Sequence, residues 1–243
     1  MRRLAPLLLF AATATVSGSA QAKCMMPSPA LVPPSGKIPS GAKLRLLVPQ
    51  FTSVKKPLTV TARLGNKSVP VVVTKLDTPP AELDAYLVQL GVSAPGAPTL
   101  ELPTQYGSTT WSLDVDPGWK APAIAKETPT VGHVVTSWTC SHERSRQLAF
   151  KGGVDGYRVL LGQKKEDFAD PKKLQSVYLP SSPRAFFGAP IGSSTADLRL
   201  GFLNCFGETY TFTTTTMLAE VRALLPDGTE PVVTPAPISV SAP

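Results

Sequence analysis

The sequence predicts an all-β protein with two sandwich-like cores, and three observations carry this prediction. Proline is about twice as frequent as its usual ~5%, with 26 in 243 residues. Proline breaks helices but is tolerated at turns, sheet edges and strand starts. Apolar and polar residues alternate with a period of two in many short segments, which is typical of half-buried strands. These segments recur about every 8–15 residues, as in a β-sandwich.

The first series of predicted strands lies before residue 116. The segment 58–64 places four apolar residues on one face and Thr59, Thr61 and Arg63 on the other. Residues 65–67 then form a predicted tight turn, which makes 68–76 the second strand of a hairpin. Three more strands are predicted over residues 43–48, 85–90 and 109–115.

Residues 117–129 are rich in proline, lack a strand pattern and follow a turn signal. We therefore predict a linker there, between an N-terminal domain (23–116) and a C-terminal domain (130–243). A short helical turn is predicted at 166–169. Strands of the second series are predicted over residues 131–139, 156–162, 174–179, 195–206, 211–225 and 232–240.

The first 22 residues have the features of a secretory signal peptide. A basic start, Met1-Arg2-Arg3, precedes an apolar stretch that ends in Ala20-Gln21-Ala22, the small-x-small pattern of a cleavage site. We therefore predict a mature chain that begins at Lys23 and is periplasmic or secreted. The apolar stretch is too short and too interrupted to span a bilayer, so a membrane-spanning protein is not expected.

The charge pattern argues against a nucleic-acid partner. The formal net charge is +7, and removing residues 1–22 deletes two arginines and no acid, which leaves +5. The positive residues are scattered, with no run of five or six that would form a nucleic-acid arm. The expected partner is instead a protein or glycan of the cell envelope.

Three cysteines, Cys24, Cys140 and Cys205, remain after the predicted cleavage. An exported protein meets an oxidising compartment, which favours disulfides. Cys140 and Cys205 each end a predicted strand of the second half, so we predict that they form a disulfide. Closing this long loop would stabilise the fold by about 3–5 kcal/mol in the chain-entropy view. Cys24 is then free, paired between chains, or the true partner of one of the others.

Cys24, Met25 and Met26 are a candidate metal site at the predicted mature N-terminus, because thiolate and thioether ligands suit Cu(I). The residues that follow, Ser28-Pro29-Ala30 and then Gly36 to Pro39, resemble the start of bacterial CopC-type and Ig-like export domains. This resemblance implies a copper-binding periplasmic protein as an alternative. The histidines expected of such a site are absent near the N-terminus, and no cofactor is otherwise predicted.

No catalytic motif is present: the chain lacks Gly-x-Ser-x-Gly, a P-loop and Gly-x-Gly-x-x-Gly. It has only two histidines, His133 and His142. His142 lies two positions after Cys140, in a predicted polar loop with Arg144 and Arg146. A disulfide accounts for this cysteine better than a thiol–imidazole pair or a zinc site does. We therefore predict a protein that is not an enzyme.

The aromatic residues divide into core and loop positions. Trp111 and Trp138 fall in apolar strand patterns and are predicted to be core residues. Trp119, Phe186 and Phe187 lie among prolines and glycines in predicted loops. Exposed loop aromatics can stack on sugars or anchor a partner, so these three are candidate partner-binding residues.

The second half resembles an Ig-like or fibronectin-III-like sandwich through Trp138, Cys140, Cys205 and the ending 219–229. It departs from the antibody pattern, because Trp138 precedes the first cysteine. The resemblance implies two tandem Ig-like β-sandwich domains after a cleaved signal peptide. A fold does not give a function. The favoured expectation is an exported structural or interaction module.

One alternative comes from the same architecture. Two Ig-like domains in about 220 mature residues with a net positive charge also fit the periplasmic pilus chaperones. Such a chaperone holds the C-terminal carboxylate of its subunit with an arginine and a lysine in a cleft and donates a strand to it.

Overall fold

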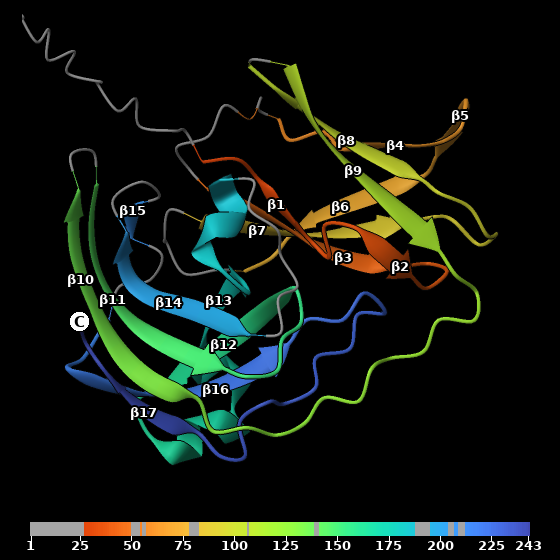
Figure 1. Cartoon of the computed structure of the whole chain (residues 1–243). Helices are drawn as coiled ribbons and strands as arrows, with labels where there is room; N and C mark the ends of the chain where they lie inside the picture. Colours follow the sequence, from red (N-terminus) through yellow and green to blue (C-terminus); the bar gives the residue numbers. More distant parts are fainter. Residues whose placement is uncertain are drawn as a thin grey trace, which may run out of the picture.

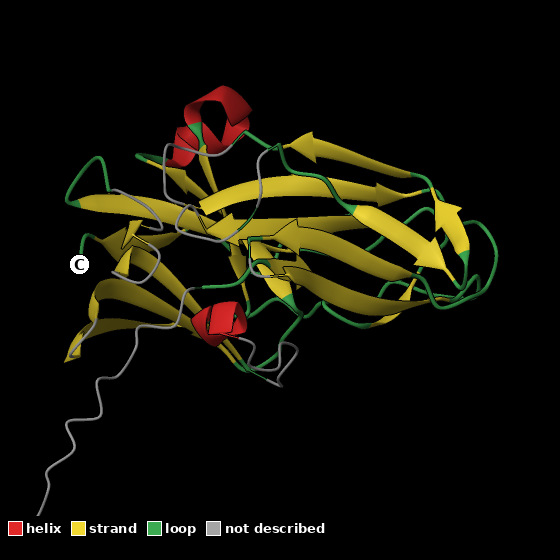
Figure 2. Ribbon diagram, turned by 90° about the horizontal axis from the view of Figure 1, so that it is seen from above, coloured by secondary structure: helices red, strands yellow, loops and turns green. Residues whose placement is uncertain are grey.

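The protein is described here from a computed structural model, which describes residues 27–49, 54, 57–77, 83–105, 107–138, 141–187, 195–203, 207–208 and 212–243. Within these ranges the regular structure is β-strand apart from three short 3-10 helices, η1 (Lys165–Ala169), η2 (Pro171–Lys173) and η3 (Pro183–Phe187). The helices lie at the periphery of the strands (Figure 2). The all-β prediction is therefore confirmed. No helix in these ranges is long and apolar enough to cross a membrane.

The first half of the chain forms two facing sheets. One has the strand order β1-β3-β7-β6 and the other the order β2-β9-β8-β4-β5. They enclose a hydrophobic cluster that includes Leu44, Leu100 and Trp111, so the predicted core position of Trp111 is confirmed. The strands are β1 (Ala30–Val32), β2 (Gly36–Ile38), β3 (Lys43–Pro49), β4 (Thr61–Leu64), β5 (Lys67–Val69), β6 (Val71–Lys75), β7 (Leu83–Leu90), β8 (Thr99–Thr104) and β9 (Gly107–Val115).

The second half repeats this plan. Its sheets have the orders β10-β11-β14-β15 and β13-β12-β16-β17, and they enclose a second cluster that includes Leu148, Val159 and Leu198. The strands are β10 (Thr130–Trp138), β11 (Ser141–Phe150), β12 (Gly156–Gly162), β13 (Gln175–Pro180), β14 (Ala196–Leu203), β15 (Gly207–Glu208), β16 (Thr216–Ala223) and β17 (Ile238–Ser241). The short helical turn predicted at 166–169 is present as η1.

The predicted hairpin strand 68–76 is wrong in one respect, because it is two strands in different sheets. β5 pairs with β4, whereas β6 pairs with β7. Pro70 separates them: it has no N–H to donate, and its carbonyl accepts a hydrogen bond from Gly91 N at 2.8 Å. The chain therefore crosses from one sheet to the other at this proline.

The predicted polar loop around His142 is also wrong, because its residues belong to β11. This strand is central in its sheet and pairs with β10 on one side and with β14 on the other. Its Glu143 is only 5% exposed and accepts hydrogen bonds from Arg199 at 2.6 Å and from Ser145 Oγ at 2.5 Å. Cross-strand pairing of polar groups thus makes a strand from a segment that lacks an apolar pattern.

The sheet of β1, β3 and β7 is buried on both faces and lies between the two cores (Figure 1). Leu31, Leu44 and Leu46 point into the first cluster, whereas Val32 and Leu47, one position along on the same strands, belong to the second. Successive side chains of a strand point to opposite faces, which is why one strand can serve both cores.

The segment between β9 and β10 forms no strand, as predicted for residues 117–129. It runs along the side of the second half (Figure 1) and is fixed near its end. Glu127 N donates to Val233 O at 2.8 Å, and the Glu127 carboxylate accepts from Lys151 N at 2.8 Å. This segment therefore closes one side of the junction between the halves.

Candidate functional site

Backbone contacts hold the two halves together. Lys43 N donates to Pro226 O at 2.7 Å, and Ser28 N donates to Phe186 O, also at 2.7 Å. At the start of β12, Gly156 lies so close to β1 that an added Cβ would come within 2.7 Å of Val32 Cγ1. A larger residue at this position would have to displace the Val32 side chain. The junction is thus a packed interface rather than a flexible hinge.

A partly buried ionic cluster crosses the same interface. Glu230 accepts hydrogen bonds from Arg45 Nη2 on β3 and from Arg158 Nη1 on β12, each at 2.9 Å. The guanidinium of Arg158 also donates to Ser176 Oγ at 2.8 and 3.1 Å and lies over the ring of Tyr178, 5.4 Å from its centroid. The Arg45 side chain is only 9% exposed. The cluster therefore ties β3 to the second half through charge as well as shape.

The pKa of Glu230 reflects this pairing. Burial alone would raise the pKa of the Glu230 carboxyl, but the hydrogen bonds and positive charges of Arg158 and Arg45 outweigh burial and hold the pKa below its ordinary value. Glu230 is therefore ionised at neutral pH, and its charge is compensated within the interface.

A cleft of about 340 Å³ opens beside this interface. One wall comes from the loop after β1 and from β2, a second from the start of the linker, and a third from the residues just before β12 and just after β16 in the second half. The lining includes three prolines, and the surface that it presents is slightly more polar than apolar. Its residues are Pro33, Ser35, Lys37, Trp119, Pro122, Gly153, Val154, Asp155, Leu224, Leu225 and Pro226. The volume lies within the range of small-ligand sites.

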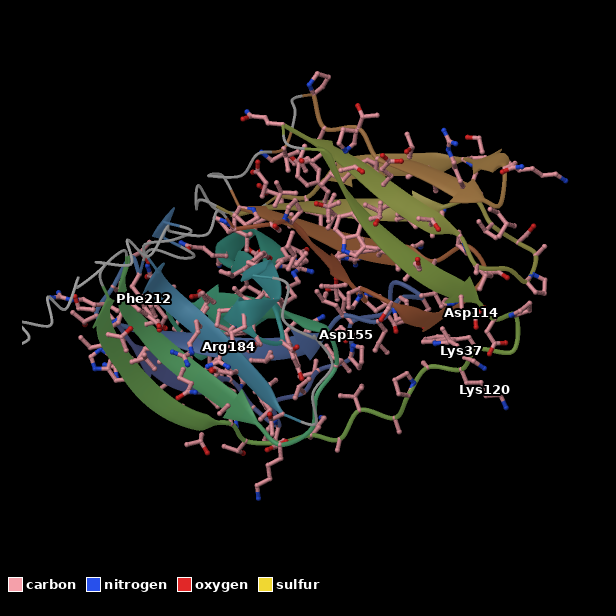
Figure 3. All side chains as sticks on the ribbon, turned by 45° about the horizontal axis from the view of Figure 1, so that its top comes forward. Lys37, Asp114, Lys120, Asp155, Arg184 and Phe212 are labelled. Carbon is pink, nitrogen blue, oxygen red and sulfur yellow. The ribbon has the colours of Figure 1, made fainter. Side chains whose placement is uncertain are left out.

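Asp155 is the unusual group in this cleft. It lies just before β12, between the two halves of the molecule (Figure 3). Its backbone carbonyl accepts from Ser181 N at 2.9 Å, but no hydrogen bond or ion pair to its carboxylate is found in the described part of the chain. Burial therefore raises the pKa of the Asp155 carboxyl above its ordinary value, since no partner stabilises the charged form.

The lysine of the cleft is already paired. Lys37 Nζ lies 3.1 Å from Asp116 Oδ2, at the end of β9 and away from Asp155 (Figure 3). The pKa of the Asp116 carboxyl is lowered by hydrogen bonds from Lys37 and from Gly118 N. Lys37 and Asp116 thus cancel one another, and the uncompensated charge that lines the cleft is that of Asp155.

A second, more apolar pocket of about 280 Å³ lies under the linker and shares Pro122, Gly153 and Val154 with the cleft. Its floor includes Tyr157, whose hydroxyl accepts from Val154 N at 3.2 Å and lies 3.3 Å from Gly152 O. Burial raises the pKa of the Tyr157 hydroxyl. The two pockets therefore adjoin one another at these shared residues.

The candidate aromatic residues separate in the structure. Trp119 is half-buried and lines the cleft. Phe186 is only 2% exposed and belongs to the second core cluster, so its prediction as an exposed partner-binding residue is wrong. The short helix η3 turns its side chain inward, where an apolar ring is more stable than in solvent. The side chains of Phe187 and Trp138 lie outside the described residues.

The other predicted site residues lie outside the described residues. These are the disulfide candidates Cys140 and Cys205 and the candidate metal ligands Cys24, Met25 and Met26. Of the histidines, His133 is exposed on β10 and the side chain of His142 is not described. In the part of the chain that is described, no group of three or more His, Cys, Asp or Glu side chains could hold a metal ion.

Sequence reasoning did not single out Asp155 or Glu230. A weak signal exists for Asp155, because it stands between Val154 and Gly156 directly before an apolar strand. Arg45, inside the apolar run 44–48, is a comparable signal for the ionic cluster. Neither pattern indicates which acid meets a base, because the partners of Glu230 are 185 and 72 positions away.

Comparisons with known proteins identify no family. No family model matches the chain, and no curated protein matches it significantly. One similar solved chain comes from a study titled "Complete structure of manganese lipoxygenase of Gaeumannomyces graminis and partial structure of zonadhesin of Komagataella pastoris". It is 10% identical and covers 85% of this chain and 90% of its own length, with a TM-score of 0.15. A likeness this weak supports no statement about fold or function.

Proposed function

We propose that the protein is an exported, non-enzymatic module of the cell envelope that consists of two tandem Ig-like β-sandwich domains and binds a protein or glycan in the cleft between them. The signal-peptide pattern of residues 1–22 supports export. The two hydrophobic clusters, each between two sheets, support the two-domain organisation. The observation that carries the binding role is a preformed cleft that combines Trp119 with an unpaired carboxylate.

The rigid junction favours binding. The cleft is built from both halves, and the hydrogen bonds, the close approach at Gly156 and the Glu230 ionic cluster fix their relation. A ligand therefore meets a site that needs little ordering, and more of the contact energy is left for affinity.

The lining of the cleft supports binding rather than catalysis. Asp155 and Lys37 are its charged residues, and Lys37 is engaged by Asp116. Nucleophilic catalysis needs a nucleophile within hydrogen-bond reach of a base, and metal catalysis needs a converging ligand set. The described lining offers a single acid without either arrangement.

The same lining disfavours the pilus-chaperone alternative. Such a chaperone needs a free arginine and lysine that meet a carboxylate. Here the free charge is a carboxylate, and the nearby arginines are occupied by Glu230. The copper alternative depends on Cys24, Met25 and Met26, whose prediction stands untested.

The binding role is tested by nitrogen-15 NMR of the mature chain. Envelope glycans and a fractionated extract of envelope proteins are added separately, and the indole N–H signal of Trp119 is followed. A ligand of this cleft shifts that signal, and Trp119→Ala weakens its binding while leaving the fold intact. Shifts confined to other faces of the molecule would contradict the proposal.

Export and the disulfide are tested together by intact mass and a non-reducing peptide map of the protein from its exported fraction. The described strands support the pairing, because Glu143 and Leu203, three and two positions from Cys140 and Cys205, are direct partners across β11 and β14. We expect a chain that begins at Lys23 and a Cys140–Cys205 peptide. Three free thiols and a bound metal would favour the copper alternative.

A further inference from the structure

The half-buried carboxylate of Asp155 has no hydrogen bond or ion pair within the described part of the chain. Because Asp155 is half-buried, its carboxylate is only partly hydrated and is stabilised by an opposite charge placed beside it. Lys37, the cation that lines the same cleft, lies 3.1 Å from Asp116. Arg45 and Arg158 are held by Glu230. Lys37, Arg45 and Arg158 are thus engaged by other acids, and a cationic ligand would supply the counter-charge that Asp155 lacks.

The surroundings of Asp155 define the rest of that ligand. Trp119 and Val154, both half-buried, offer apolar surface in the cleft, and its other charged residue is the paired Lys37. A matching group therefore has a charged tip and an apolar stem. The half-buried indole of Trp119 adds a favourable site for a cation, because a ring face attracts a nearby positive charge.

We propose that the cleft binds the side chain of a lysine from a peptide segment of its partner, with the ammonium at Asp155 and the methylene stem against Trp119. This inference rests on the proposed role of the cleft as the binding site and names the chemistry of the ligand. A carboxylate pairs with an ammonium or, bidentately, with a guanidinium, and the compact ammonium of lysine needs the smaller space of the two. A volume of about 340 Å³ lies at the small end of ligand sites, which suits one side chain.

The test uses the mature chain and Nα-acetyl-lysine N-methylamide as the probe. Binding is followed through the NMR signal of the Trp119 indole N–H. We expect saturable binding that becomes about tenfold weaker or more in Asp155→Asn, because the ammonium loses its counter-charge. We expect the same loss when the probe is acetylated at Nε, which removes its charge but keeps its stem.

Asp114→Asn is the matched control, because Asp114 is an exposed acid of β9 that does not line the cleft. It should bind the probe as the wild type does. Asp155→Asn is expected to fold at least as stably as the wild type, so its loss of binding would not reflect misfolding.

The other outcomes are distinguishable. Glucosamine that binds more tightly than the lysine probe, with the same dependence on Asp155, would overturn the choice of lysine and keep a cationic ligand. A neutral glycan or peptide that shifts Trp119 and binds equally well to Asp155→Asn would overturn the inference and leave the binding role of the cleft in place. No shift of Trp119 with any of these ligands or with envelope extracts would overturn both.

Discussion

Two acids at the junction of the halves have opposite environments. Glu230 is held between two arginines, and its pKa is lowered despite burial. Asp155 lies at the same junction without a charged partner, and burial raises its pKa. The two acids therefore have different roles in the same interface. A compensated charge joins the two halves, whereas an uncompensated charge lowers stability and gives the cleft a group that a ligand can satisfy.

The largest expected effect comes from Glu230→Gln, which removes the compensating charge. Arg45 and Arg158 would then be left in the interface without a counter-charge, and we expect the free energy of unfolding to fall by about 3 kcal/mol. Urea unfolding at pH 7 measures this change. A loss no larger than that of Asp116→Asn, whose partner Lys37 is exposed, would show that the cluster does not hold the halves together.

The same variant has a defined pH dependence. The folded-state pKa of Glu230 is below the ordinary value of 4.5, so its stabilising effect is fully present above about pH 4.5 and is lost as the pH falls through the lowered pKa. The difference in stability between wild type and Glu230→Gln should therefore shrink in acid. A difference that stays constant from pH 7 to pH 3 would contradict the pairing.

The next largest effect tests the shape of the junction. In Gly156→Ala the new methyl would lie 2.7 Å from Val32 Cγ1 and 3.2 Å from Leu179 O. We expect a loss of about 1–3 kcal/mol, as is typical of overpacking. Gly152→Ala is the control, because an added Cβ there has no neighbour within 4 Å. Equal thermal midpoints for the two variants would mean that the halves are not packed as tightly as described.

A smaller effect of opposite sign is expected for Asp155→Asn. The folded-state pKa of Asp155 is raised, so this carboxyl favours folding below its ordinary value of 3.8 and loses that effect as the pH rises through the folded pKa. At pH 7 the neutral amide should raise the free energy of unfolding by about 0.5–1 kcal/mol, a modest gain because solvent still reaches the group. A clear loss of stability at pH 7 would indicate a structural partner for this carboxylate.

The smallest effect is expected for Trp119→Ala. Its ring is half-buried and belongs to neither core cluster, so we expect less than about 1 kcal/mol of lost stability beside a loss of binding in the cleft. Phe186→Ala is the contrasting variant, with an expected loss of about 3 kcal/mol, because that ring is buried. Similar losses of stability for both would contradict the distinction between a binding aromatic and a core aromatic.

Local patterns were sufficient for much of the fold. The alternation in 43–48, 85–90 and 109–115 predicted β3, β7 and β9, and the prolines of 117–129 marked a segment without strands. The sequence-based prediction failed where a segment forms a strand only because neighbouring strands pair with it. β11 contains Glu143, Arg144 and Arg146 and becomes a strand because β10 and β14 pair with it on both sides. Of the candidate site, only Trp119 was foreseen.

By itself the sequence determined the all-β class, the positions of most strands and the break between the two series of strands. It could do so because period-two alternation and proline act through the local backbone. The tertiary structure alone decided that one sheet serves two cores, that Phe186 turns inward, and that Glu230 meets two arginines while Asp155 meets none. These outcomes depend on which residues distant in sequence become neighbours, since the cost of burying a charge is set by the partners that packing places within a few ångströms.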